Sequence, residues 1–344
     1  MSKTVKKKFI TAPRILIFVG FCFAVLFTVW LLLRSAIIKG VSTQIKIAES
    51  QGYLVNHEGL SITGFPFQII AKSQEISVRA PTSPLNDPAK NWAITLDDLT
   101  VNSATLTPLS WQIDHNGSAR IDMRAPTGQR YMFDIEPARI HTKTSLKLGG
   151  TLKSAFISLD KTRINTLVGT PPPLLGLAHT DLDIKVVGTI AHIEFNAHDL
   201  VFTDQALGLL HAILGQKITQ IKVQANVHNW GILEKQGFAS WQDSHAKLHV
   251  EHWEIKWGDI DFTGDLDIVF KDGAPDGILH IQLKDIKPLL GKLKDAGMIN
   301  GTIQSQAKLL LGAIDENENG RKEIELVLRN GQLKMGPIAL FTFR

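Results

Sequence analysis

The sequence predicts a mainly β protein that follows a single N-terminal transmembrane helix. Residues 15–33 form a run of 19 residues without one charged side chain. From residue 52 onward, apolar and polar residues alternate with a period of two, and only three or four short helices are expected to interrupt this pattern. We therefore expect long, antiparallel, meandering sheets after the anchor, in a twisted groove-like or sandwich arrangement.

The apolar run 15–33 predicts an uncleaved membrane anchor. At 1.5 Å per helical residue, it covers roughly the 30 Å of a bilayer's hydrocarbon core. Arg14 and Arg34 bracket the run, and Trp30 lies where an interfacial aromatic side chain is expected. A secretory signal peptide is the alternative, but its apolar region is typically shorter, and Arg34-Ser35-Ala36 is a poor cleavage site.

The charges around the anchor predict its orientation. Residues 1–14 carry five of the 37 lysines and arginines and no acid, so the positive-inside rule makes them a basic cytoplasmic tail. With six of the 37 cations in residues 1–34, 31 remain against 33 acids in the rest of the chain. Nucleic-acid binding is therefore not expected. The single cysteine, Cys22, lies in the anchor, and an exported part without thiols suits an oxidising compartment.

The remaining chain divides into a helical extension and a β-rich domain. Residues 34–51 contain helix formers and no proline, so we expect them to prolong the anchor until Gly52 ends the helix. The β-rich domain then covers residues 52–344. Three consecutive prolines, residues 171–173, predict a joint between two possible halves near residues 165–178. A split into two domains stays open.

Several segments alternate clearly enough to predict individual strands. They are residues 92–96, 99–103, 131–135, 182–186, 221–227 and 260–270. In the last segment, three aspartates and Thr263 occupy the face opposite the apolar residues, which indicates one solvated face. Asn330-Gly331 predicts a type I′ turn between strands 323–329 and 332–335. The expected helices are residues 206–214, 286–295 and 303–313.

A set of short motifs, in a fixed order, resembles a known family. The motifs are Gly64-Phe65-Pro66-Phe67, Trp257-Gly258, Gly264-Asp265-Leu266, Leu328-Arg329-Asn330-Gly331 and Gly336-Pro337-Ile338. With the anchor, they resemble the bacterial family called domain of unknown function 2125, seen mostly in alphaproteobacteria, over almost the whole chain. The resemblance implies a single-pass inner-membrane protein with a cytoplasmic N-terminus and a periplasmic bulk. It carries over no catalytic residue.

More distantly, the anchor followed by long β-strands is similar to AsmA-like envelope proteins. That similarity implies a link to lipid transport through an apolar groove, at the level of fold alone. The structural motif residues of the closer family resemblance are Gly64, Pro66, Asn330, Gly331, Gly336 and Pro337.

Two aromatic pairs are candidates for an apolar ligand or partner surface. Phe65 and Phe67 share one strand face if the alternation continues across Pro66, and Trp253 and Trp257 share another. Packing in a core is the alternative reading of both pairs. An apolar groove or a partner-facing stripe would use the same side chains.

Catalytic, metal and cofactor sites are not expected. His245, His249 and His252 would share a helix face, but the alternation around them predicts a strand on which they diverge. Residues 315–320 resemble half of a calcium loop, yet loop position 12 is Leu326, so an acidic turn is the preferred interpretation over a calcium site. The chain also lacks the Gly-x-Ser-x-Gly, His-Glu-x-x-His and phosphate-loop motifs.

We therefore expect a non-enzymatic envelope protein, attached to the inner membrane through residues 15–33. The preferred hypothesis is that an apolar β-groove shields or passes lipid. The alternative is an envelope scaffold or adaptor that binds a protein partner, for example by strand addition. An unrecognised hydrolase is the remote alternative. Co-purifying lipid would favour the first hypothesis, and a stoichiometric protein would favour the second.

Overall fold

The computed structural model describes residues 12–81, 92–124, 130–166, 173–202, 213–258, 260–271, 274–284, 287–297, 299–312, 314–329, 331–336 and 338–342. Within these residues, sixteen strands form one antiparallel sheet. They are β1 (Leu54–Glu58), β2 (Ser61–Thr63), β3 (Gln68–Arg79), β4 (Trp92–Ala104), β5 (Ser110–Arg124), β6 (Arg130–Leu146), β7 (Leu152–Thr166), β8 (Pro173–Val187), β9 (Ile190–Phe202), β10 (Lys217–Val227), β11 (Lys247–Trp257), β12 (Ile260–Lys271), β13 (Ala274–Lys284), β14 (Lys322–Arg329), β15 (Gln332–Met335) and β16 (Ile338–Thr342). The helices are α1 (Ala12–Ser50), α4 (Trp230–Asp243), α5 (Lys287–Asp295) and α6 (Gly301–Gly312).

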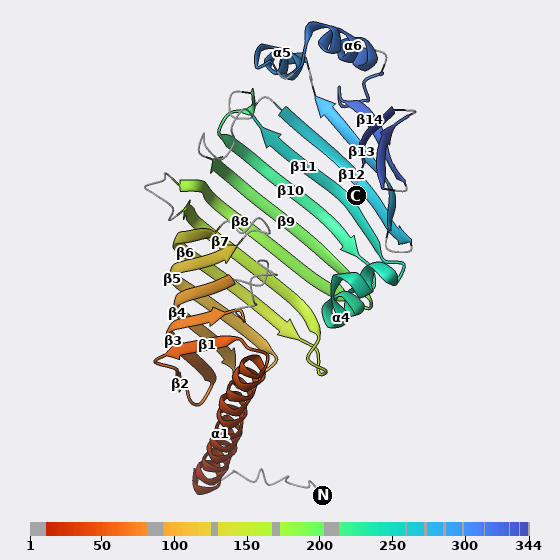
Figure 1. Cartoon of the computed structure of the whole chain (residues 1–344). Helices are drawn as coiled ribbons and strands as arrows, with labels where there is room; N and C mark the ends of the chain where they lie inside the picture. The colour runs from red at the N-terminus through yellow and green to blue at the C-terminus, as the bar shows by residue number, and fades with distance from the viewer. Residues whose placement is uncertain are drawn as a thin grey trace, which may run out of the picture.

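The sheet is a simple meander. From β3 to β16 each strand pairs with the next strand in the sequence, while β1 and β2 both pair with β3. The helix α1 lies at the β1 end of the sheet, and α5 and α6 lie at the opposite end (Figure 1). This confirms the prediction of a mainly β protein with an N-terminal helix, long antiparallel strands and a few short helices.

Helix α1 is continuous through the predicted anchor and its extension. Within the described residues it is the one helix long and apolar enough to cross a membrane. It ends in a Schellman motif, in which the Gly52 amide donates to Glu49 O at 2.9 Å and the Tyr53 amide donates to Ala48 O at 3.0 Å. Gly52 adopts φ +88°, which a residue without a Cβ tolerates.

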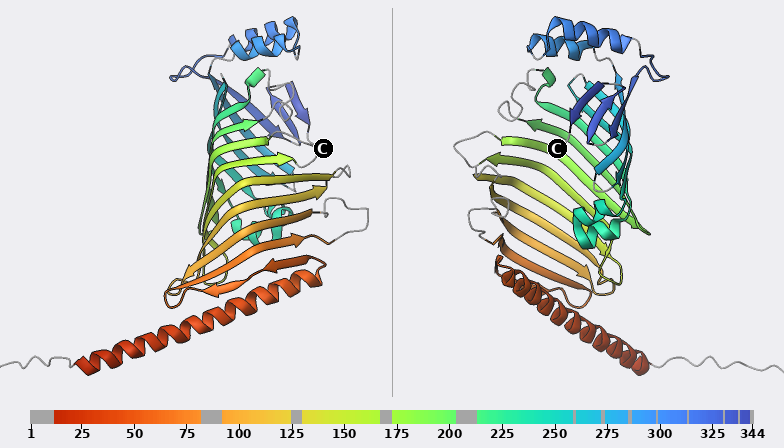
Figure 2. Two further views of the ribbon diagram at one scale, coloured as in Figure 1. Left: turned by 90° about the vertical axis from the view of Figure 1, so that its left-hand side faces the viewer. Right: turned by 45° about the vertical axis from the view of Figure 1, so that its right-hand side comes forward.

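A line of irregular pairing crosses the sheet from β3 to β10. The register leaves out Asp98 in β4, Lys161 in β7 and Asp199 in β9, and these residues adopt φ of 46°, 46° and 54°. The positions left out in neighbouring strands lie opposite each other, and the register shifts along the same line between β4 and β5 and between β5 and β6. We call this line the crease, and the sheet curves along it into a trough (Figure 2), because such irregularities bend strands.

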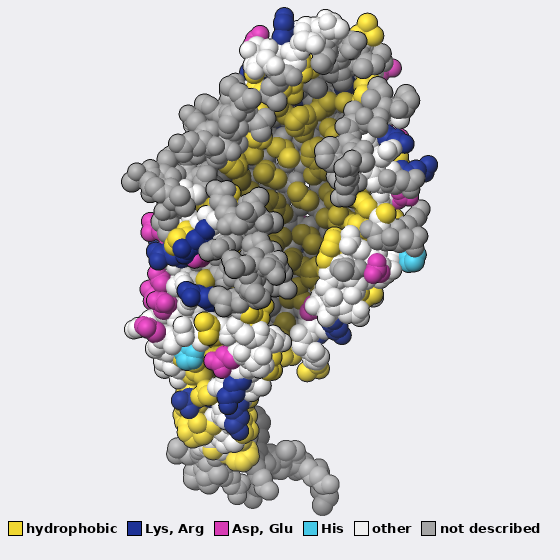
Figure 3. Space-filling view, viewed as in Figure 1, with side chains coloured by type: hydrophobic (Ala, Val, Ile, Leu, Met, Phe, Trp, Pro, Cys, Tyr) yellow, Lys and Arg dark blue, Asp and Glu magenta, His cyan; other side chains and the backbone are white. Residues whose placement is uncertain are grey.

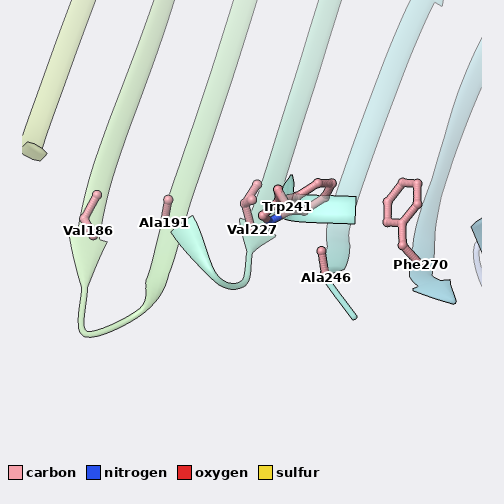
Figure 4. Close-up of a cluster of buried hydrophobic side chains, with 6 residues drawn as sticks. All are labelled: Val186, Ala191, Val227, Trp241, Ala246 and Phe270. Carbon is pink, nitrogen blue, oxygen red and sulfur yellow. The ribbon is translucent and has the colours of Figure 1, made fainter. Parts of the chain in front are cut away.

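The trough is one layer thick over most of its area, which matches the groove-like arrangement and not a sandwich. The accessible surface is 21,876 Å², whereas a globular chain of this mass exposes roughly 14,000 Å². A cluster of buried apolar side chains lies where α4 covers the ends of β8 to β12 (Figure 4). The cluster consists of Val186, Ala191, Val227, Trp241, Ala246 and Phe270.

Several of the predicted local elements are present in the structure. The hairpin strands at 323–329 and 332–335 correspond to β14 and β15, and the helices at 286–295 and 303–313 correspond to α5 and α6. Most of the predicted helix 206–214 lies outside the described residues, as do residues 167–172 of the proposed joint at 165–178. Helix α4 was not predicted, and its backbone leaves the helical conformation at Gly237, with φ +84°.

Candidate functional site

One row of directly paired residues runs across twelve strands, and nearly all of them are apolar. Each member is the register partner of the next, so all of them lie on one face of the sheet. We call them the apolar row: Ala71, Val101, Ile113, Thr142, Ile157, Leu182, Phe195, Val223, Trp253, Gly264, Ile281 and Ile324.

The residues one position further along the same strands form a matching polar row. It lies on the opposite face, because successive side chains in a strand alternate between faces. Its members are Lys72, Thr100, Asp114, His141, Ser158, Asp181, Asn196, Lys222, Glu254, Thr263, Gln282 and Glu323. Along these two rows the faces of the sheet are therefore largely segregated by polarity.

The crease preserves this segregation. In β7, Ile157 and Leu159 lie on the apolar face before the crease, and after it Ile164 pairs with two further apolar residues, Ile135 and Leu175. The apolar alternation of the sequence therefore changes phase by one position across Lys161, where the backbone adopts φ 46°. The same shift separates Leu96 from Leu99 in β4. The bend thus brings two apolar halves of each strand toward each other.

The apolar face is concave and stays open. Seen from this side, the molecule has a long hollow floored by hydrophobic side chains, which we call the apolar groove (Figure 3). Apart from Gly264, every member of the apolar row retains partial exposure to solvent. A second sheet or a layer of helices would bury such side chains, so the described residues provide no complete cover for this face.

Helix α4 covers one margin of the groove. Its Trp241 packs edge-on against Phe270 with ring centroids 5.2 Å apart, and its indole donates to His228 O at 2.6 Å. Its Glu234 accepts a hydrogen bond from the Leu152 amide at 2.7 Å. The helix therefore reaches from the start of β7 to the end of β12.

The polar face carries histidines paired with carboxylates on neighbouring strands. His179 contacts Asp160 through Nδ1 and Asp181 through Nε2, each at 2.6 Å. The hydrogen bond to Asp160, followed by that to Asp181, raises the pKa of His179 above its ordinary value. Similar pairs join His141 to Asp114 at 2.6 Å, His249 to Asp267 at 2.8 Å and His280 to Asp265 at 2.7 Å.

The Gly64–Phe67 turn contacts the anchor helix directly. The Phe65 ring makes edge-to-face contacts with Phe23, Phe27 and Trp30, with centroid distances of 5.3, 5.2 and 5.6 Å. The Trp30 indole donates to Gln68 O at 3.0 Å. These helix residues are spaced by four and three positions, so they form one stripe on α1. The turn therefore fixes the first strands of the sheet to the apolar part of α1.

The candidate residues named from sequence lie in two separate places. Phe65 and Phe67 are in the β2–β3 turn and do not share a face, because Phe65 packs on α1 while 67% of Phe67 is exposed. Trp253 and Trp257 share the apolar face of β11, opposite Gly264 and Ile260 of β12. Eight strands separate the two pairs, so they do not form one site.

The structural motif residues occupy turns. A Cβ on Gly64 would lie 2.8 Å from Gln68 O, and its φ of +102° also favours glycine. Pro66 follows a cis peptide bond, and Gly331 and Gly336 adopt positive φ. Asn330 and Pro337 lie outside the described residues.

The described residues give no candidate metal site. No group of three or more histidine, cysteine or acidic side chains there is placed to hold a metal ion. His245 lies in a turn with φ 54°, whereas His249 pairs with Asp267. The acidic turn at 315–320 is held by Asn317, whose Oδ1 accepts the amides of Asn319 and Arg321 at 3.0 Å.

Sequence reasoning missed the contact between Phe65 and α1, and it missed α4. The stripe Phe23, Phe27 and Trp30 is visible in the sequence at helical spacing. However, it lies in a segment where every residue is apolar, so the spacing carries no signal.

Comparison with known proteins identifies one family. Residues 30–343 match the model of a family described as "Uncharacterized protein conserved in bacteria (DUF2125)". No curated protein and no solved structure matches the chain. These results do not show the more distant similarity to AsmA-like proteins.

Proposed function

Because this chain belongs to the DUF2125 family of uncharacterised bacterial proteins, its role has to be argued from its geometry, and we propose that it holds lipid acyl chains in its apolar groove while anchored in the bacterial inner membrane. The observation that carries this proposal is the apolar row. It presents a continuous, half-exposed hydrophobic floor across twelve paired strands, backed by a polar row that faces water.

The energetics favour a chain-like apolar ligand. Transfer of hydrocarbon out of water contributes about 0.8 kcal/mol per CH₂ group, so an acyl chain laid along the row would gain several kcal/mol. Covering the apolar row contributes further favourable binding free energy, because its exposed apolar side chains lose contact with water. A small compact ligand would fill only a fraction of a trough that runs past twelve strands.

The proposed location follows from the anchor. Helix α1 is long and apolar enough to cross a bilayer, and the basic residues before it favour a cytoplasmic N-terminus. The β-sheet then lies in the periplasm, where a lipid in transit needs shielding from water. We assign no catalytic step to the protein.

Photocrosslinking in the full-length protein tests the proposal. A benzophenone amino acid replaces Phe195 on the apolar row or its neighbour Asn196 on the polar row, and intact-protein mass spectrometry follows irradiation in living cells. We expect adducts with the mass of a phospholipid or glycolipid at Phe195 and not at Asn196. The two positions share the same strand and the same distance from the membrane, so they differ only in the face they occupy.

Other outcomes would overturn the proposal. If neither position yields a lipid adduct, the groove does not carry lipid. A protein adduct at Phe195 would instead support a scaffold or adaptor role for the same face.

A further inference from the structure

Four turns lie on one rim of the sheet, and each exposes a large apolar side chain, three of them within the turn and Val187 as the last residue of β8 before it. We call this the anchor-side rim, made of residues 64–67, 105–109, 147–151 and 187–189. The exposed fractions are 67% for Phe67, 76% for Leu106, 92% for Leu148 and 66% for Val187. Turns normally expose polar residues such as Asn, Asp and Ser, so this row of apolar tips needs a physical reason.

The meander places these turns together. In an antiparallel sheet every second turn lies on the same side. Backbone hydrogen bonds connect neighbouring turns of the anchor-side rim. The Thr105 amide donates to Phe67 O at 2.8 Å, and the Leu146 amide donates to Leu109 O at 2.8 Å. At the far end, the Trp230 amide donates to Thr189 O at 3.0 Å, which joins α4 to the same rim.

This rim points in the same direction as the N-terminal end of α1. In Figure 2 the strands at the α1 end of the sheet run roughly alongside the helix, and their anchor-side turns end toward its N-terminus. The Phe65 contacts fix that relation, because they attach the first turn of the rim to Phe23, Phe27 and Trp30.

The attachment point lies within the predicted membrane span. Phe27 is six residues before Leu33, the last residue of the apolar run, which corresponds to about 9 Å along the helix axis. Interfacial apolar groups typically lie about 5–10 Å into the boundary between headgroups and acyl chains. An upright α1 therefore brings the Phe65 turn to the depth of the upper acyl chains.

The composition of the rim fits a lipid surface. The four turns contain no Asp or Glu, and Lys147 is their one cation. Carboxylates would be repelled by anionic headgroups and costly to dehydrate, whereas a lysine can extend its ammonium group to a phosphate. A water-exposed rim would have no reason to exclude acids from all four turns.

We propose that the anchor-side rim inserts into the periplasmic leaflet of the membrane, so that the apolar groove opens along the bilayer surface and not away from it. The inference rests on the membrane anchor of the proposed function, and it is independent of what the groove holds. The partner that the anchor-side rim contacts is the lipid bilayer. Lipid would then enter the groove sideways, between α1 and α4.

Fluorescence quenching in proteoliposomes tests this placement with the full chain. In a Cys22→Ser background, single Leu106→Cys or Leu148→Cys variants carry an environment-sensitive fluorophore. Leu309→Cys in α6, which is 74% exposed at the opposite end of the sheet, is the matched control. We expect the two rim labels to be quenched by nitroxide lipids and to be several-fold less sensitive to aqueous iodide than the control label.

Three outcomes are distinguishable. Rim labels as sensitive to iodide as the Leu309 label would overturn the inference, even if lipid crosslinks at Phe195 persisted. Rim labels shielded from both iodide and nitroxide lipids would also overturn it, because they would indicate a protein contact. Rim insertion without a lipid adduct at Phe195 would support the inference and reject lipid binding in the groove.

Discussion

At the scale of single residues, His179 shows how the polar face responds to protons. Its two ring nitrogens lie 2.6 Å from carboxylates on two strands, Asp160 of β7 and Asp181 of β8 itself. Only the protonated imidazolium donates from both nitrogens at once. The folded state therefore favours the charged form, which is why the pKa of His179 is raised.

Replacing Asp160 with Asn should lower the pKa of His179 toward the ordinary value near 6.5, because the largest stabilising hydrogen bond is lost. A raised folded-state pKa contributes stability that is complete below about 6.5 and is lost as the pH rises through the folded pKa. The stability difference between the wild type and Asp160→Asn should therefore be larger at low pH. NMR titration and urea unfolding at several pH values measure both effects.

The control for this prediction is Asp265→Asn. This change should lower the pKa of His280, which Asp265 raises through the same kind of hydrogen bond, and leave His179 unchanged. A stability difference for Asp160→Asn that grows as the pH rises would contradict the argument.

At the scale of elements, the Phe65 contact joins the anchor to the sheet. Phe65→Ala should loosen the β2–β3 turn from α1, because each edge-to-face ring pair contributes about 0.5–1.5 kcal/mol and Phe65 makes three such pairs. Amide exchange in β2 and at the start of β3 should then accelerate by roughly tenfold or more. Hydrogen-exchange mass spectrometry of the protein in nanodiscs measures this.

Phe67→Ala is the matched control, since it removes the same side chain from the same turn. The ring contacts with α1 come from Phe65, whereas the exposed Phe67 faces lipid under the rim proposal, so its loss should accelerate amide exchange in β3 far less than Phe65→Ala does. Equal acceleration in both variants would mean that the turn is held by its own backbone and not by α1.

The elements also show what could be predicted from sequence. Strand 260–270 was predictable because its apolar residues keep one phase throughout. In β4 the phase changes at Asp97-Asp98, which the sequence shows but does not explain. The explanation is a bulge that aligns with bulges in other strands, and such alignment depends on pairing. Helix α4 was not predictable, because Gly231 and Gly237 weaken its helical pattern.

The sequence could predict which aromatic residues share a strand face, and it could not predict whether that face is open. Alternation placed Trp253 and Trp257 on one strand face, and the structure places both on the apolar face. Sequence alone could not say whether that face was covered, because cover depends on elements distant in the chain. Phe65 and Phe67 were expected on one face, but the turn around cis-Pro66 breaks the alternation and separates them.

At the scale of the whole molecule, the open trough has two ends that are not equivalent. One end lies against α1, the candidate membrane anchor, and the other lies near α5 and α6 (Figure 1). In the apolar row, Ile113 belongs to the half near α1 and Ile281 belongs to the distant half. If lipid enters near the membrane, its movement to the distant half must pass the strands β7 and β8.

Two charged side chains in the middle of the groove should therefore prevent lipid from moving between its two halves. Ile157→Asp with Leu182→Asp places two carboxylates on directly paired positions of the apolar row, and an acyl chain cannot pass them without desolvating both. Photocrosslinking from Ile113 should still yield lipid adducts, whereas crosslinking from Ile281 should lose them. Thr100→Asp with Asn196→Asp adds the same charges to the polar row, each between a lysine and an aspartate on the two neighbouring strands, and should leave both adducts intact. Adducts that persist at Ile281 in the blocked variant would mean that lipid reaches the distant half without travelling along the groove.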